Sequence, residues 1–117
     1  MTEVILYGIK NCDTVKKARR WLDESQVAYR FHDVRADGLS LDMINQWIAA
    51  AGWEKVLNRA GTTWRKLAPE VQQQVNADNV AALLLEQPAM IKRPVLDQSG
   101  AITIGFKPDL YATRFNS

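Results

Sequence analysis

The sequence predicts an α/β fold in which a β-α-β unit and a β-β-α unit are separated by a helical segment. Near the amino terminus, an apolar β-prone run and a run of alternating apolar residues flank an amphipathic helical pattern. In the middle, apolar residues recur at helical spacing, and near the carboxyl terminus a Gly-containing turn separates two β-prone runs. With 117 residues, of which 47% are hydrophobic and 24% charged, the chain is long enough for one domain with its own core.

The amino-terminal third is predicted to form two strands joined by a helix. Residues 3–7 form a buried strand, residues 13–25 a helix and residues 26–34 a second strand. A connecting helix of this length favours parallel strands with a right-handed crossover. The residues on the inner side of the helix are Val15, Ala18, Leu22 and Ser25. The alternating apolar residues of the second strand are Val27, Tyr29 and Phe31.

The middle of the chain is predicted to begin with a capped helix. Ser40 has the side chain of a helix N-cap, and residues 53–57 add a further turn after this helix. The residues expected on the inner face of the capped helix are Leu41, Ile44, Ile48 and Ala51.

Two more helical pieces follow in the sequence. Thr63 is predicted to cap a short helix at residues 64–67, which ends before Pro69. Residues 77–86 form another helix, which closes at Pro88.

The carboxyl-terminal part changes to a strand pattern. Residues 94–96 and 101–104 flank the turn at 97–100, which indicates a β-hairpin. The final short helix follows Lys107, because Pro108 is favoured at the first position of a helix.

The order of these elements predicts one thioredoxin-like domain over residues 1–117. Its β-α-β half covers residues 1–36, its helical insert residues 39–88 and its β-β-α half residues 91–117. No repeat, linker or low-complexity stretch divides it.

The only cysteine of the chain is the strongest candidate for chemistry. Cys12 follows the turn at residues 8–11 and lies at the amino end of the first predicted helix. Backbone N–H groups and the helix dipole there favour a thiolate over a thiol, and Lys10, Lys16 and Lys17 add positive charge nearby. A free cysteine is also often a small buried apolar residue, and from this residue alone both interpretations stay open.

Composition excludes several classes of function. A net charge of +2 is too small to indicate nucleic-acid binding, and one cysteine cannot form an internal disulfide. His32 is the only histidine, so the sequence predicts no metal site. We expect no secretion leader, no membrane segment, a reducing cytoplasmic location and a monomer.

The chain resembles the arsenate reductase-related (ArsC/Spx) family of the thioredoxin-like fold, and within it the YffB-like members. The resemblance spans nearly the whole chain in the order of the family. It rests on the stretches Tyr7-Gly8-Ile9-Lys10-Asn11-Cys12-Asp13-Thr14, Gly61-Thr62-Thr63-Trp64-Arg65-Lys66-Leu67, Ile91-Lys92-Arg93-Pro94-Val95 and Gly105-Phe106-Lys107-Pro108.

The resemblance implies a catalytic role for Cys12 and an anion site beside it. Pro94 would be a cis proline that packs against the thiol and exposes its neighbouring backbone to an extended thiol peptide such as glutathione. Arg93 would stabilise the thiolate and hold a carboxylate or an oxyanion at two points.

Other residues complete the implied anion and glutathione site. Lys107 stands where related arsenate reductases carry an arginine, and an ammonium cannot make the planar fork of a guanidinium. Arg59 is the candidate for a further arginine of that set. Lys10, Asn11 and Thr14 come from the stretch around the thiol.

The function expected from these residues is that of a monothiol, glutathione-dependent thiol–disulfide oxidoreductase acting through a mixed disulfide on Cys12. Val15 occupies the position of a second cysteine three residues on, so the resolving thiol comes from glutathione or a glutaredoxin-like protein, with no bound cofactor. Two alternatives are an Spx-like regulatory adaptor that binds a protein partner and a true arsenate reductase. Lys107 argues against the second of these.

Overall fold

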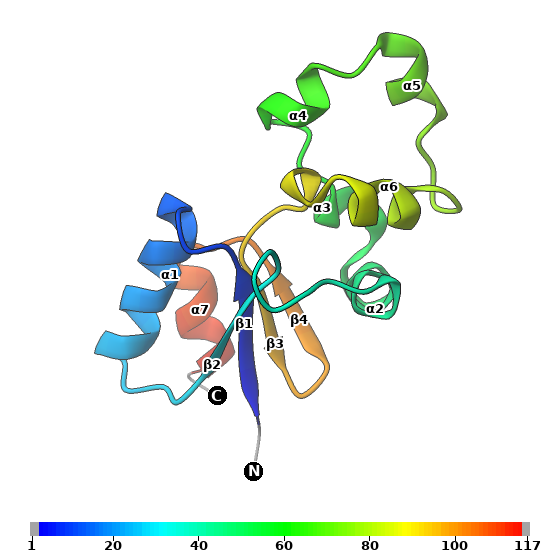
Figure 1. Ribbon diagram of the computed structural model, residues 1–117. Helices are drawn as coiled ribbons and strands as arrows, with labels where there is room; N and C mark the ends of the chain where they lie inside the picture. The colour runs from blue at the N-terminus through cyan, green and yellow to red at the C-terminus, as the bar shows by residue number, and fades with distance from the viewer. Residues whose placement is uncertain (1–2, 116–117) are drawn as a thin grey trace. The chain divides into compact units, whose positions relative to one another are not determined.

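The computed structural model describes residues 3–115 (Figure 1). Its elements are, in chain order, β1 (Val4–Gly8), α1 (Asp13–Glu24), β2 (Arg30–Asp33), α2 (Leu41–Ala51), α3 (Trp53–Val56), α4 (Thr62–Arg65), α5 (Pro69–Gln74), α6 (Val80–Glu86), η1 (Pro88–Met90), β3 (Val95–Gln98), β4 (Ala101–Ile104) and α7 (Pro108–Phe115). The predicted order of a β-α-β unit, a helical segment and a β-β-α unit is therefore confirmed.

The strands form a four-stranded mixed sheet in the order β2-β1-β3-β4. β1 runs parallel to β2, as expected for strands joined by a helix, and antiparallel to β3. β3 and β4 form an antiparallel hairpin around Ser99 and Gly100, whose φ angles of 52° and 98° suit a two-residue turn. The α/β fold with a thioredoxin-like core agrees with the prediction.

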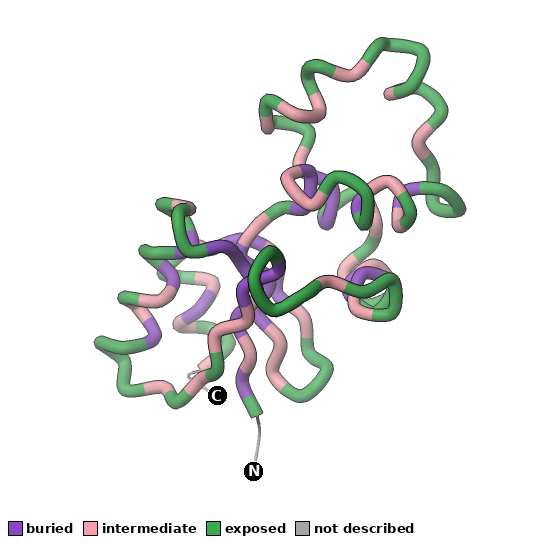
Figure 2. Tube along the Cα trace, in the orientation of Figure 1, coloured by how far each residue is buried: buried purple, intermediate pink, exposed green. Residues whose placement is uncertain are grey.

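The core of the sheet-containing unit lies between β1, β3 and the two helices α1 and α7. Its buried cluster consists of Val4, Leu6, Ala18, Leu22, Leu96 and Tyr111. Leu6 and Leu96 are directly paired across β1 and β3, so their side chains leave the same face of the sheet. α1 and α7 both contribute to this cluster and therefore cover that face (Figures 1 and 2).

The chain divides into two compact units. One consists of the described residues of Met1–Gly38 and Arg93–Ser117, and the other of Leu39–Lys92. The helical unit buries residues from α2, α3, α6 and η1, namely Ile44, Trp47, Val56, Val80, Leu84 and Met90. The segment that follows α3 is tied to the segment that follows η1 by the N–H of Asn58 to the carbonyl of Met90 (2.8 Å) and by the N–H of Lys92 to the carbonyl of Val56 (2.8 Å). α4 and α5 bury no residue.

The structure corrects the length of the second predicted strand and the inner face of α2. The second strand is shorter than residues 26–34, because Gln26 has a φ of 59° and the chain turns there before it can pair with β1. In α2, Ser40 caps the helix as predicted, its Oγ accepting the N–H of Met43 at 3.2 Å. The inner face, however, is formed by Ile44 and Trp47. Leu41, in the first turn, is 44% exposed because the apolar stripe begins one turn later.

The structure also corrects the helices of the second half of this segment. Thr63 does not cap α4; Gly61 is the N-cap and Thr63 lies inside the helix. α6 begins at Val80 rather than at residue 77, because Asn76 and Asn79 bond each other's backbone in a preceding turn. α4 ends before Pro69 as predicted, and Pro69 also opens α5, a helix that the sequence analysis missed.

Within residues 3–115, no helix is long and apolar enough to cross a membrane.

Candidate functional site

Four chain segments meet at one edge of the sheet. β1 ends at Gly8 and the parallel strand β2 ends beside it at Asp33, because these two residues are paired. β3 is antiparallel to β1 and starts at Val95, opposite Tyr7. β4 ends at Ile104, which pairs with Val95. The segments that leave or enter these four strand ends are therefore brought to the same edge.

Three predicted site positions lie in these segments. Cys12 follows β1, the Arg93–Pro94 pair precedes β3, and Lys107 follows β4. They are far apart in the sequence, and the sheet pairing collects them within one unit of the fold. This common edge supports the grouping that the family resemblance implies.

Cys12 is the N-cap residue of α1. Its backbone is extended, with φ −106° and ψ 123°, and its carbonyl accepts the N–H of Lys16 at 2.9 Å. Its side chain makes no capping hydrogen bond and is half-buried. The first N–H groups of a helix have no partners within the helix, so the thiol stands at an end that favours an anion. Asp13 in the first turn of α1 competes for the same favourable end.

Gly8 allows α1 to approach the end of β1 closely. A Cβ atom built on Gly8 would lie 2.8 Å from Cγ2 of Val15, which is fully buried. A side chain at position 8 would therefore push the start of α1, and Cys12 with it, away from the sheet.

Asp33 organises the turn that leaves β2 beside the cysteine segment. Its Oδ1 accepts the N–H groups of Arg35 at 2.8 Å and Ala36 at 3.1 Å, while its own N–H donates to Oδ2 of Asp37 at 3.0 Å. Asp33 is only 6% exposed. Its burial would raise the pKa of the carboxyl, but the N–H groups of Arg35, Ala36 and Lys10 and the charge of Lys10 lower that pKa below its ordinary value.

The Arg93–Pro94 peptide bond is cis, as the resemblance implies. Pro94 is buried and its carbonyl accepts the N–H of Gly105 at 2.8 Å, which ties the start of β3 to the end of β4. Arg93 is half-buried. The structure thus fixes the backbone of the predicted anion site, while the role of Arg93 stays a prediction.

The remaining polar candidates of this unit lie on its surface. Lys10, Asn11 and Thr14 are exposed around the thiol. Lys107 is exposed just before α7, and its carbonyl accepts the N–H of Tyr111 at 3.1 Å. Their accessibility suits binding of a ligand from solvent, and their roles stay predictions.

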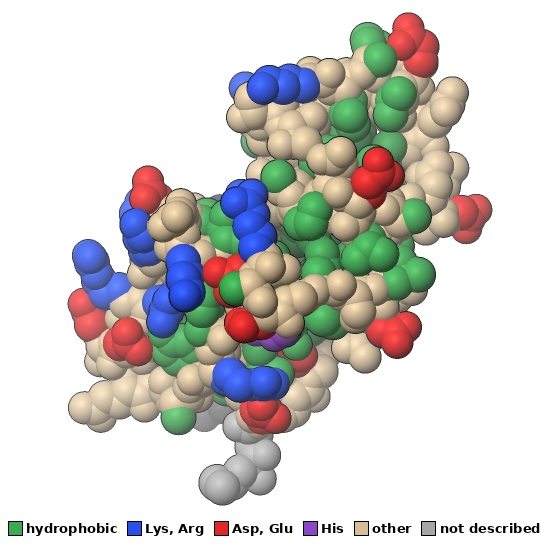
Figure 3. Space-filling view, viewed as in Figure 1, with side chains coloured by type: hydrophobic (Ala, Val, Ile, Leu, Met, Phe, Trp, Pro, Cys, Tyr) green, Lys and Arg blue, Asp and Glu red, His purple; other side chains and the backbone are tan. Residues whose placement is uncertain are grey.

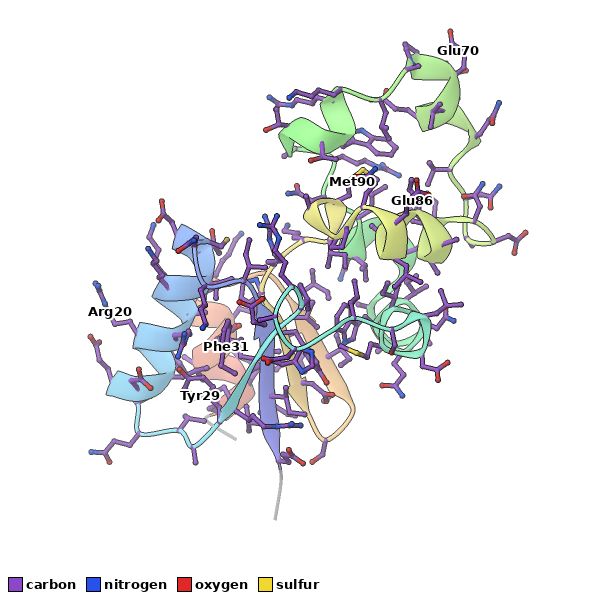
Figure 4. The ribbon with its side chains drawn as sticks, in the orientation of Figure 1. Arg20, Tyr29, Phe31, Glu70, Glu86 and Met90 are labelled. Carbon is purple, nitrogen blue, oxygen red and sulfur yellow. The ribbon has the colours of Figure 1, made fainter. Side chains whose placement is uncertain are left out.

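The basic residues of α1 are not equivalent to one another. Arg19 packs inward: its guanidinium lies 4.2 Å from the ring centroid of Phe31, and its Nε donates to the hydroxyl of Tyr29 at 3.2 Å. Tyr29 and Phe31 lie beside α1, whereas Arg20 extends from it into solvent (Figure 4). In the space-filling view, Lys and Arg side chains gather over the region of α1 (Figure 3).

Arg59 belongs to the helical unit. Its guanidinium lies 5.4 Å from the ring centroid of Trp53, and the side chain is exposed. This contact is a cation–π pair within that unit. A role for Arg59 in anion binding stays a prediction.

The described residues offer no candidate metal centre. No group of three or more His, Cys, Asp or Glu residues that could hold a metal ion occurs within residues 3–115. The Nε2 atom of His32 lies 2.7 Å from the carbonyl oxygen of Gly38, so the ring is held by the loop after β2.

Asp33 is the site-bordering residue that sequence reasoning missed. The signal for it was present: an acidic residue at the end of a predicted strand, followed by Asp37-Gly38, is typical of a turn held by a side-chain carboxylate. What the sequence could not indicate is the register of the predicted parallel pair, which sets Asp33 opposite Gly8 and places this carboxylate beside the cysteine turn.

Comparison with known proteins gives a consistent result. The sequence model of the ArsC family matches residues 7–113. The solved structure of a YffB protein is 53% identical, covers 94% of this chain and 96% of its own, and superposes with a TM-score of 0.88. An arsenate reductase (ArsC) related protein from Brucella melitensis is 46% identical, covers 98% of this chain and 96% of its own, and has a TM-score of 0.80.

A more distant relative is a regulator. The global transcriptional regulator Spx of Bacillus subtilis is 25% identical over 91% of this chain and 82% of its own length. The matched range of the family model contains Cys12, Arg93, Pro94 and Lys107. Fold and sequence similarity lead to one conclusion: this chain belongs to the ArsC family.

Proposed function

We propose that this chain is a monothiol thiol–disulfide oxidoreductase that uses glutathione as its co-substrate. The observation that carries the proposal is the position of Cys12 as the N-cap of α1, with a half-buried side chain that makes no capping hydrogen bond. Helix N–H groups and the helix dipole favour the thiolate there, and the thiolate is the nucleophile of thiol–disulfide exchange. Membership of the ArsC family supports the same chemistry.

The reaction proceeds in two exchanges that balance in sulfur and electrons. The Cys12 thiolate attacks the glutathione sulfur of a mixed disulfide; the bond from Cys12 to glutathione forms, and the substrate thiolate leaves and takes up a proton. A second glutathione thiolate then attacks the glutathione sulfur bound to Cys12. Oxidised glutathione leaves and the Cys12 thiolate is restored. The substrate mixed disulfide is reduced to a thiol and one reduced glutathione is consumed; this glutathione and the one taken from the substrate leave together as oxidised glutathione, and the proton of the attacking thiol balances the one taken up by the substrate thiolate.

The second thiol has to come from outside the chain. Cys12 is the only cysteine, and Val15, which stands three residues later, is fully buried in the core. Glutathione itself, or a glutaredoxin-like protein, supplies the resolving thiol. The proposal needs no bound cofactor, no metal, no nucleic acid and no membrane, and a monomer in the reducing cytoplasm suffices for it.

The cationic groups at the same sheet edge hold the anionic parts of the thiol peptide. Arg93, half-buried before β3, makes a two-point contact to a carboxylate, and the exposed Lys107 adds a point charge. Because Lys107 lacks the planar fork of arginine, a peptide carboxylate suits this pocket better than a tetrahedral oxyanion.

The test of the nucleophile is the alkylation rate of Cys12 against pH, in folded and in unfolded protein. We expect the folded protein to react faster than the unfolded chain at neutral pH, because the helix start is lost on unfolding. Incubation with oxidised glutathione should add one glutathione, measured by mass spectrometry, and excess glutathione should remove it. The Cys12→Ser variant should do neither. A folded protein whose thiol reacts no faster than the unfolded chain at neutral pH would overturn the proposal.

The test of the anion site compares two arginines. Arg93→Ala should slow alkylation at neutral pH and weaken glutathione binding, whereas Arg20→Ala, which removes an exposed charge from α1, should change both only slightly. Identical profiles for the two variants would remove Arg93 from this role.

The Spx likeness favours a second candidate, a regulatory adaptor that binds a protein partner. A stoichiometric partner that is captured equally by the wild type and by Cys12→Ser, together with an inert thiol, would support the adaptor. Arsenate reduction, the third candidate, requires arsenate-dependent oxidation of glutathione or of a glutaredoxin. The lysine at position 107 makes us expect none.

A further inference from the structure

The cysteine segment leaves the sheet beside a buried carboxylate. Asp33 is only 6% exposed, and burial of a charged group is costly unless other groups compensate it. It lies at the end of β2, directly paired with Gly8 at the end of β1. The next residue, Val34, donates its N–H to the carbonyl of Gly8 at 2.9 Å, which joins the two strand ends.

The carboxylate acts on two backbone segments. On one side, its Oδ1 accepts the N–H groups of Arg35 and Ala36 and holds the turn that leaves β2. On the other side, the pairing of Asp33 with Gly8 places it two residues from Lys10, whose backbone N–H and ammonium both lower the pKa of the carboxyl; Lys10 in turn lies two residues before Cys12. A carboxylate has about four acceptor sites, so it can serve both segments at once.

The charge of Asp33 is retained at neutral pH because these donors outweigh its burial. They lower the pKa of the carboxyl below its ordinary value, which means that the ionised form is the one stabilised in the folded protein. Asp37 is exposed, and its Oδ2 accepts the N–H of Asp33 at 3.0 Å. Within residues 3–115, its carboxylate makes no hydrogen bond or ion pair with the cysteine segment.

We propose that Asp33 is a positioning residue for Cys12. Its carboxylate holds the turn that contains Lys10 (residues 8–11, the Lys10 turn) against the end of β2, and so sets the position of the thiol at the start of α1. This inference rests on the proposed thiol exchange. Asp33 touches neither the thiol nor its substrate in the reaction. It acts through the backbone at Lys10, and a small displacement there changes the line of attack on a disulfide, which has to be nearly straight.

The experiment compares Asp33→Asn with Asp37→Asn. Both remove one carboxylate charge from the same turn, but only the first removes the group that attracts Lys10. For each variant, two rates are measured at a pH where the alkylation profile has reached its plateau, so that the thiol is ionised in every protein. One rate is for iodoacetamide, a small reagent with loose demands on geometry, and the other is for oxidised glutathione.

We expect Asp33→Asn to lower the glutathione rate about tenfold relative to the iodoacetamide rate, because a displaced thiol costs more where the geometry of attack is strict. Asp37→Asn should leave the ratio of the two rates within about twofold of the wild type. A folded Asp33→Asn variant with the wild-type ratio would overturn the inference. Mere destabilisation does not change the ratio, since both reagents use the same folded thiol.

A second measurement uses the wild-type protein and covers the case in which Asp33→Asn does not fold. In an NMR titration from pH 7 to acid, the amide resonance of Lys10 should shift together with those of Arg35 and Ala36, with one common midpoint below about 3.9, the ordinary value of an aspartate. If the amide resonance of Lys10 does not shift in this titration, the inference is overturned. If wild-type Cys12 does not react with oxidised glutathione, the proposed function fails, while the titration still decides whether Asp33 holds the Lys10 turn.

Discussion

The sheet-containing unit and the helical unit bury their apolar residues in different ways. In the first, strands and helices that are distant in the sequence share one cluster, and α1 buries residues along its whole length, from Val15 to Leu22. In the second, α2 and α6 bury two residues each, while α4 and α5 bury none. The stretch from Gly61 to Leu67, which resembles the YffB-like members, lies on the weakly buried part of the second unit.

The unit with the shared core is the one that holds the candidate reacting groups. The cysteine, the cis proline and the buried carboxylate belong to the unit whose core is shared among many segments, and a rigid support is what a reacting group needs. Short helices with few buried contacts open more easily and tolerate substitution. We therefore expect substitutions in the sheet-containing unit to disturb the reacting groups more than substitutions in the α4–α5 region do.

The largest expected effect is on the shared core. Leu6→Ala, at a fully buried position of β1, should lower the free energy of unfolding by about 2–5 kcal/mol, because it leaves a cavity between sheet and helices. Val71→Ala in α5, where the side chain is 43% exposed, should stay within about 0.5 kcal/mol of the wild type. Urea unfolding measures both. Equal losses for the two variants would break the comparison between the units.

The next effect concerns two glycines. Gly8→Ala should cost about 1–3 kcal/mol, because its Cβ would lie 2.8 Å from the buried Val15 side chain and force α1 outward. Gly61→Ala in the helical unit meets the side-chain Nδ2 of Asn58 at 3.0 Å, an atom of a flexible side chain that can move. Thermal unfolding should therefore show a much smaller loss for Gly61→Ala. A neutral Gly8→Ala would mean that β1 and α1 are not tightly packed.

A smaller effect is expected from the cap of α2. Ser40→Ala removes the Oγ that accepts the N–H of Met43 and should cost about 1 kcal/mol. Ser40→Asp keeps an acceptor and should restore most of the loss. Because the cap belongs to the helical unit, amide exchange should accelerate in α2 and stay unchanged in β1 and β3. Acceleration throughout the chain would show that the units unfold together.

The smallest effect, confined to acid, tests the sheet-containing unit alone. The folded pKa of Asp33 is lowered, so its contribution to stability is complete above the unfolded value of about 3.9 and is lost as the pH falls through the folded pKa. Asp33→Asn should therefore flatten the acid limb of a plot of stability against pH. An unchanged limb in Asp33→Asn would contradict this assignment.

Local patterns predicted much of the fold because the forces involved are local. Apolar spacing defined α1, the N-cap preference of serine marked the start of α2, and the fixed φ of Pro108 marked the start of α7. At Pro69 the proline signal correctly marked the end of the preceding helix but did not indicate that the same residue opens α5.

The sequence by itself determined which residue can be the nucleophile, since Cys12 is the only thiol, and it determined that this thiol begins a helix, because strand, turn and helix signals adjoin there. The tertiary structure alone decided what surrounds it. Strand pairing brings Asp33, Pro94 and Gly105 to the edge where β1 ends, and such pairing depends on contacts between distant segments that no local pattern encodes. The sequence alone therefore identifies the thiol, whereas the residues around the thiol depend on the register of the sheet.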